Sequence, residues 1–237
     1  MPLKKASYAR IAALDAGSAG AIAGRLKKIS FGLNSDVHVV SASHSGSELA
    51  VELAVRREVE GQTFDSDKGR FVGEKRYDYR QLQFEIDTAS ALARTPGARR
   101  DLGPLVEQLR RCGASSAEVV DLRVDMLAWT EAFLRMYQTA QFGAMVVDDY
   151  FTEPRLIGRY AAKSVDNRLD LEFTRRHAGQ LRSMRFAVFA EGVRRSVEVR
   201  RDMVLSVTSA EEEDLENFFE EQEKLLKSHS SVSDDDE

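Results

Sequence analysis

The densest run of large apolar side chains in this 237-residue chain lies between Ser115 and Gln141 and reads SSAEVVDLRVDMLAWTEAFLRMYQTAQ. It contains the only tryptophan, Trp129. On a helical wheel the large apolar residues between Val119 and Tyr137 form one stripe, and the charged residues fall on the far side. This pattern predicts an amphipathic helix that packs as a central core element, with the rest of the fold arranged around it.

The beginning of this run has two interpretations. Ser115 and Glu118 have the spacing of a capping box, in which each side chain bonds the backbone N–H of the other residue, and this predicts a helix start. Residues 119–126 also alternate between apolar and charged side chains, which is typical of a strand. The strong helix formers in residues 127–138 favour the helix, and the strand remains the alternative.

The part of the chain before this run carries the two-residue period of β-strands. Residues 48–57 read ELAVELAVRR and residues 76–86 read RYDYRQLQFEI. Residues 60–69 between them are expected to be a hairpin connection or a mobile loop. The apolar parity of the second run changes between Tyr79 and Leu82, which predicts a β-bulge or a bend.

The pattern of residues after Gly143 predicts an antiparallel sheet. Five strand-like runs follow one another with turns of a few residues, and turns this short join antiparallel neighbours. One hairpin is expected between residues 155 and 174, with Leu169, Leu171 and Phe173 facing inward.

The expected fold class is therefore α+β, with one or more antiparallel sheets packed on a central amphipathic helix. We expect residues 1–113 to form an N-terminal α+β portion and residues 114–208 to hold the central helix and the antiparallel β-hairpins. Residues 209–228 are expected to form an acidic C-terminal helix, and residues 229–237 a disordered acidic tail. The two large portions form either one sheet or two related halves, and no internal repeat in the sequence decides between them.

Charge is divided unevenly along the chain. The net charge is −5, but residues 209–237 alone carry 12 acidic and 2 basic side chains, so the remainder has a balance of +5. Ser209 and Glu212 have capping-box spacing, and further acidic residues follow where the helix dipole favours them. A mildly basic body with a strongly acidic end favours binding to charged partners.

The basic residues between positions 168 and 201 are all arginines, whose planar guanidinium groups suit bidentate pairing and stacking. Alternate residues of a hairpin share a face, so several of these arginines are expected to line one outer sheet face. A solvated face that the acidic helix neutralises is the alternative interpretation. The residues expected to bind a partner are Arg175, Arg176, Arg182, Arg185, Arg194, Arg195, Arg200 and Arg201.

An arginine-rich face suits an acidic protein surface or the phosphates of a nucleic acid. Sheets that bind RNA usually add exposed aromatic side chains, whereas Phe173, Phe186 and Phe189 are expected to face inward. A protein partner is therefore favoured, and RNA or DNA is the alternative. Ser231 and Ser233 each precede an acidic residue by three positions, a spacing that acidophilic kinases use, so both are candidate phosphorylation sites.

No pattern in the sequence points to catalysis, a metal or a cofactor, and no residue is assigned to any of these roles. Cys112 is the only cysteine, which excludes an intramolecular disulfide, and the four histidines are scattered. No stretch is long and apolar enough for a membrane helix. An enzyme with a dispersed site near Asp148, Asp149 and His177 remains a third possibility.

The expected function is that of a non-enzymatic interaction or assembly protein, a subunit of a larger intracellular complex. It would use the arginine-rich sheet face and the acidic C-terminal helix to bind protein partners. The cytoplasm is the expected location, with the nucleus and the mitochondrion as alternatives. The oligomeric state is not predicted.

Overall fold

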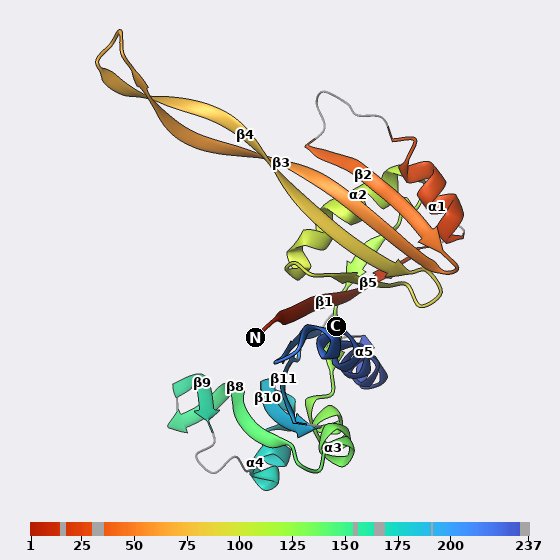
Figure 1. Cartoon of the computed structure of the whole chain (residues 1–237), viewed down its shortest axis with the longest axis vertical. Helices are drawn as coiled ribbons and strands as arrows, with labels where there is room; N and C mark the ends of the chain where they lie inside the picture. Colours follow the sequence, from red (N-terminus) through yellow and green to blue (C-terminus); the bar gives the residue numbers. More distant parts are fainter. Residues whose placement is uncertain (15–17, 30–35, 154–155, 164–168, 191, 233–237) are drawn as a thin grey trace. The chain divides into compact units, whose positions relative to one another are not determined.

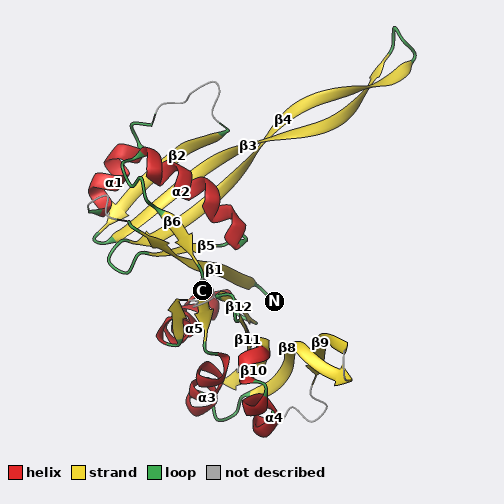
Figure 2. Cartoon of the chain, turned by 180° about the vertical axis from the view of Figure 1, so that it is seen from behind, coloured by secondary structure: helices red, strands yellow, loops and turns green. Residues whose placement is uncertain are grey.

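The computed structural model describes residues 1–14, 18–29, 36–153, 156–163, 169–190 and 192–232. Helices combine with strands that pair in antiparallel fashion, which confirms the α+β class (Figure 1 and Figure 2). The chain divides into two compact units. One, here called the N unit, consists of Arg10–Val119, and the other, the C unit, combines Met1–Ala9 with Val120–Glu237.

The sheet of the N unit is built on four consecutive antiparallel strands, each paired with the next. The end of β1 (Leu3–Ala12) lies next to the fourth of them, and β6 (Glu118–Val120) also pairs with β1. The four strands are β2 (Val37–Ser45), β3 (Glu48–Asp65), β4 (Arg70–Asp87) and β5 (Leu92–Thr95).

Two helices cover one face of this sheet, α1 (Ala19–Leu26) and α2 (Leu102–Arg111) (Figure 2). A short 3-10 helix, η1 (Arg99–Asp101), leads into α2. Leu49, Val51 and Leu53 occupy alternate positions of β3 and are buried. The two-residue period therefore works as expected, because one face of β3 meets the helices and the other does not.

Beyond the helices, β3 and β4 continue together as a long two-stranded arm, residues 57–80 (Figure 1). None of the side chains described in the arm is buried. The pairing runs from the base to the turn without a register shift, so the expected bulge between Tyr79 and Leu82 is wrong. The change of parity instead marks where β4 leaves the helices, since Leu82 faces them and Tyr79 lies on the opposite face.

The sheet of the C unit has the order β1-β12-β11-β10-β8-β9, and its strands are antiparallel. Residues Leu3–Ser7 of β1 pair with β12, so the first strand of the chain lies beside the last strand of the meander. The other strands are β8 (Gln141–Glu153), β9 (Leu156–Lys163), β10 (Leu181–Ala190), β11 (Val193–Arg200) and β12 (Val204–Ser209).

The core of the C unit lies between this sheet and two helices, α3 (Met126–Met136) and α5 (Glu212–Ser228). Trp129 is fully buried and stacks on Phe133, with ring centroids 5.2 Å apart. Phe133 in turn packs on Phe186 of β10 at 5.0 Å. Aromatic contacts of this kind add about 0.5–1.5 kcal/mol each beyond their burial.

The favoured helix over residues 119–126 is wrong, and the alternating pattern there forms strands. β6 includes Val119, and β7 (Leu122–Val124) pairs with β13 (Ser230–Val232), so distant strands satisfy the backbone groups of this segment. The helix begins only at Met126. Asp125 caps it, because its carboxylate accepts hydrogen bonds from the N–H groups of Leu127 and Ala128 at 3.1 and 2.9 Å.

Two further expectations are also wrong, one because of a local helix cap and the other because of pairing with a distant strand. Residues Leu171–Arg176 form a helix, α4, in place of a strand, because Asp170 caps it by accepting from the N–H of Phe173 at 2.9 Å. The start of the expected disordered tail is also ordered, since β13 pairs with β7. The rest of the tail, residues 233–237, lies outside the described residues.

The two units repeat one order of elements: strand, helix, four-stranded meander, helix, strand. In the N unit this order is β1-α1-β2-β3-β4-β5-α2-β6, and in the C unit it is β7-α3-β8-β10-β11-β12-α5-β13. The closing strand pairs with the opening strand in each case, β6 with β1 and β13 with β7. β9 and α4 are insertions between β8 and β10. The interpretation of two related halves stays a prediction.

Candidate docking surface

The helix-free face of the C-unit sheet carries the candidate site. In β10 the buried Met184 and Phe186 face α3 and α5, so Arg185 points to the opposite side. Arg185 lies opposite Glu198 of β11, and the residues at the same parity in β11 include Arg194 and Arg200. We call this side of the sheet the arginine face.

The arginine face also includes two lysines from distant parts of the chain. The register runs straight across the sheet from Lys5 of β1 through Ser206, Glu198, Arg185 and Ala144 to Lys163 of β9. Lys5 was missed by sequence analysis, because nothing local shows that the first strand lies near residues 181–200. Several of the side chains between the cations are short. They include Ser183, Ala187, Ser196, Ser206 and Thr208.

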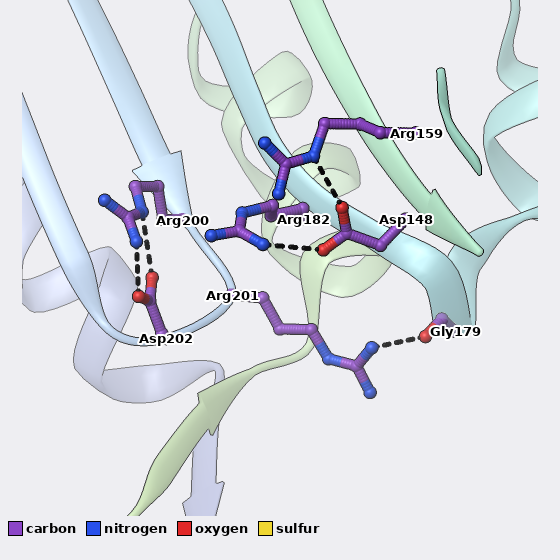
Figure 3. Close-up of polar contacts among 7 residues, drawn as sticks. All are labelled: Asp148, Arg159, Gly179, Arg182, Arg200, Arg201 and Asp202. Atoms are coloured by element: carbon purple, nitrogen blue, oxygen red, sulfur yellow. Dashed lines mark hydrogen bonds and ion pairs between the residues drawn. The ribbon is translucent and has the colours of Figure 1, made fainter. Parts of the chain in front are cut away.

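At one end of β10 and β11, several arginines gather around two carboxylates (Figure 3). Arg159 and Arg182 both donate to Asp148, each at 3.0 Å. Desolvation alone would raise the pKa of Asp148, but the hydrogen bonds from Arg182 and Arg159 outweigh it and hold that pKa below its usual value. Asp148 is therefore ionised at neutral pH and serves as the anion of an ion-pair network.

The same cluster contains Arg200 and Arg201, which are adjacent in the sequence at the end of β11 (Figure 3). Arg200 makes a bidentate pair with Asp202, at 3.0 and 2.5 Å, and Arg201 donates to the carbonyl oxygen of Gly179. Three guanidinium groups thus pair with two carboxylates, and the fourth, that of Arg201, bonds a backbone carbonyl, so these six side chains together carry a net positive charge.

Three of the expected binding arginines lie elsewhere. Arg175 and Arg176 belong to α4. Arg175 pairs with Glu131 of α3 at 2.9 Å, and Arg176 pairs with Glu172 at 3.0 Å. Arg195 lies on the helix-covered side of β11, where it forms a bidentate ion pair with Asp214 of α5. Only 14% of the Arg195 side chain is exposed. Its place is between the sheet and α5.

The expectation that Phe189 faces inward is wrong. Its ring is 48% exposed and lies at the parity of Arg185, on the arginine face and not inward. The guanidinium carbon of Arg194 lies 5.7 Å from the centre of this ring. Phe186 is buried as expected. The sequence contained an indication of this placement, because Phe189 is an odd number of positions from the buried Phe186 and alternation puts the two on opposite faces of the strand. We expected Phe189 to face inward because it is apolar.

The acidic helix α5 does not cover the arginine face. Its apolar side, including Leu215, Phe218 and Phe219, is buried on the opposite face of the sheet. Among the described residues, no carboxylate lies within ion-pair distance of Arg185 or Arg194. These two cations are exposed and form no ion pair with a described carboxylate.

The remaining candidates lie apart from this surface. Ser231 is exposed in β13, opposite Arg123, and Ser233 lies outside the described residues. The Nδ1 atom of His177 lies 3.1 Å from the side-chain oxygen of Gln180, and its ring packs on Phe173 at 4.5 Å. The carboxylate of Asp148 is engaged by arginines. The described residues thus give no geometric support to a catalytic pairing of Asp148 with His177.

Among the residues that the structure places, no group of three or more His, Cys, Asp or Glu side chains is arranged to hold a metal ion. No helix in the described part of the chain has the length and apolar character needed to cross a membrane. No protein-family model matches the chain, and no curated protein matches it.

Proposed function

We propose that this chain is an interaction and assembly protein, a subunit of a larger intracellular complex, whose arginine face binds an acidic surface of a protein partner. The observation that carries this proposal is the pair Arg185 and Arg194. Both are exposed on a helix-free sheet face, and neither has a carboxylate partner among the described residues. Arginine is enriched in protein interfaces because its planar group makes several hydrogen bonds and stacks at the same time.

A protein partner suits this surface better than a nucleic acid. Carboxylates stand among the cations, with Glu198 facing Arg185 and with Asp148 and Asp202 at the end of the sheet. Such mixed charges favour a partner with its own fixed pattern of charges, whereas a polyphosphate is repelled by each carboxylate. Of the side chains that the structure describes on this face, Phe189 alone is an exposed aromatic ring, and sheets that bind RNA stack bases on two or three.

The exposed side of α5 provides a second surface in this proposal, for a basic partner. Glu212, Glu213 and Glu220 are exposed there, whereas the opposite side of the helix is buried. Because α5 and the arginine face lie on opposite sides of the sheet, one protein is able to hold an acidic and a basic partner at the same time.

The first test is Arg185→Glu combined with Arg194→Glu. We expect this variant to retain about a tenth or less of the partner that copurifies with the wild-type protein, because two unpaired cations become anions that face an acidic surface. Quantitative mass spectrometry of proteins purified from the native cell measures the loss. The matched control is Arg175→Glu with Arg176→Glu, which changes the same charge on α4 and leaves the arginine face intact.

Equal copurification of the wild-type protein and the Arg185/Arg194 variant contradicts the proposal. Binding to nucleic acid contradicts it as well, and a salt titration identifies that outcome. The affinity for a nucleic acid falls steeply and linearly with the logarithm of the salt concentration, and nuclease treatment abolishes the signal.

A further inference from the structure

The helix-free face of the N-unit sheet is also exposed, and its charge has the opposite sign. Glu48, Glu52 and Glu85 occupy the positions that alternate with the buried Leu49 and Val51 and with Phe84 and Ile86. Glu85 pairs with Arg94, whereas Glu52 accepts hydrogen bonds from two neutral groups among the described residues, those of Ser41 and Gln81. Among the described residues, no cation lies within ion-pair distance of Glu48 or Glu52.

The same face continues along the arm as an aromatic surface. Tyr79 lies opposite Arg56 and Tyr77 opposite Glu58, at the parity of Glu52. The two tyrosines are 52% and 55% exposed. At the tip, Phe64 and Phe71 pack edge to face at 5.3 Å and are also exposed. We call Glu48, Glu52, Tyr77 and Tyr79 together the acidic-aromatic face.

An exposed aromatic surface of this extent requires an explanation. The arm is a two-stranded ribbon without a buried side chain, and such a ribbon is only marginally stable by itself. Tyrosine and arginine are also the residues that most often dominate binding energies at interfaces. The aromatic side chains of the arm are therefore placed as anchors for a partner and not as part of the core.

We infer that the acidic-aromatic face of one copy of this chain binds the arginine face of a second copy. Among the described residues, Glu48 and Glu52 have no cation within ion-pair distance, and Arg185 and Arg194 have no carboxylate within that distance. Arginine pairs with carboxylates and also stacks on tyrosine rings, as Arg56 of this chain does on Tyr77, with its guanidinium carbon 4.6 Å from the ring centre. Glu48, Glu52 and the exposed ring of Tyr79 therefore fit a guanidinium-rich surface. This inference rests on the proposed function and names the partner of the arginine face.

The predicted association is head to tail. The two faces belong to different units of the chain, so a contact between two copies leaves one face of each kind free. Such a heterologous contact extends into a chain of copies or closes into a ring. Assembly therefore depends on protein concentration and weakens as salt screens the unpaired charges.

Two charge-reversal variants test the inference. The first is Arg185→Glu with Arg194→Glu, and the second is Glu48→Arg with Glu52→Arg. Sedimentation velocity over a wide range of concentration measures the association of each full-length protein. We expect the wild type to associate, and each variant alone to bind itself at least about tenfold more weakly, because like charges then meet across the contact.

An equimolar mixture of the two variants is the decisive measurement. In the mixture the intact arginine face of one variant meets the intact acidic-aromatic face of the other, and the two reversed faces are complementary as well. We expect the mixture to associate, which also demonstrates that both variants are folded. The double variant Tyr77→Ala with Tyr79→Ala is a second test of the same contact. We expect it to weaken association without changing a charge.

A wild-type protein that remains monomeric at every concentration overturns the inference. So does a mixture that stays dissociated, or an association that neither charge reversal weakens. The proposed function is tested separately by copurification. If Arg185→Glu with Arg194→Glu loses a copurifying protein while the wild type is monomeric, the arginine face binds a different acidic protein. If that variant keeps both its copurifying proteins and its self-association, both proposals fail.

Discussion

Two neighbouring arginines, Arg194 and Arg195, lie on opposite sides of the sheet and have different roles. Arg194 is exposed on the arginine face, whereas Arg195 is nearly buried against α5 and pairs with Asp214. Ser209 also donates to Asp214, at 2.7 Å, and accepts from the N–H of Glu211 at 3.3 Å. Arg195, Asp214 and Ser209 therefore fasten the first turn of α5 to the sheet, so a binding experiment that alters Arg195 also disturbs the fold.

Asp214→Asn tests this fastening. The hydrogen bond from Arg195 is the main cause that holds the pKa of Asp214 below its ordinary value, and the hydrogen bond from Ser209 adds to it, against an opposing effect of desolvation. We expect the substitution to lower the free energy of unfolding by about 1–3 kcal/mol at neutral pH, because it weakens a charge-assisted and nearly buried pair.

The pH dependence of that difference has a defined sign. A carboxylate whose folded pKa is depressed stabilises the protein above its unfolded pKa of about 3.9, and that stabilisation is lost as the pH falls through the folded pKa. The gap between the wild type and Asp214→Asn should therefore close in acid. Urea unfolding at a series of pH values measures it, with the exposed Glu213→Gln as control. A gap that is constant with pH contradicts the assignment.

At the scale of elements, local patterns located the strands well and the helix starts poorly. The alternation in residues 48–57 correctly places Leu49, Val51 and Leu53 in the core. The segment 119–126 carries both a helix-start signal and a strand pattern, and only pairing with distant strands decides for the strand. The expected connection at residues 60–69 is a hairpin, but its turn occupies only residues 66–69, because β3 and β4 remain paired up to Asp65 and Arg70.

Shortening the arm tests whether it contributes to the stability of the N unit. Asn-Gly in place of residues 64–71 joins Thr63 to Val72, a facing pair, and Asn-Gly favours a two-residue hairpin turn. We expect the free energy of unfolding to change by less than about 1 kcal/mol, because no buried side chain is lost.

Leu53→Ala, at the base of the same strand, is the contrasting variant. Leu53 is fully buried, so this substitution should cost about 2–5 kcal/mol. Chemical denaturation followed by circular dichroism compares the two variants. A large loss of stability on shortening the arm contradicts the view that the arm is an exposed extension.

At the scale of the whole molecule, the first strand of the chain serves both units. Residues Leu3–Ser7 pair with β12 in the C unit, whereas the N–H of Ile11 bonds the carbonyl oxygen of Ala91 in the N unit. The C unit therefore depends on residues that precede the whole N unit in the sequence. This arrangement makes the N-terminal strand a structural part of a sheet formed mainly by residues more than a hundred positions later.

Deletion of residues 2–7 tests this dependence. β12 then loses its partner along one edge, because Leu205 loses its pairing with Ala6 and Val207 loses its pairing with Lys4. We expect faster amide hydrogen exchange in β12 and β11, with protection retained at Leu49–Leu53 of the N unit. Exchange followed by mass spectrometry measures both regions. Leu3→Ser serves as the control, since it changes an exposed side chain and leaves the strand pairing in place.

The amino-acid sequence by itself determined the α+β class, the antiparallel pairing and the alternation that separates Arg185 from Met184 and Phe186. These properties are local, because turn length and a two-residue period act over a few neighbouring positions. Only the tertiary structure decided which face of each sheet the helices cover. It also decided that Arg195 meets Asp214, that Lys5 joins the arginine face, and that Val119 lies in a strand. Those outcomes depend on partners far away in the chain, whose identity no local pattern contains.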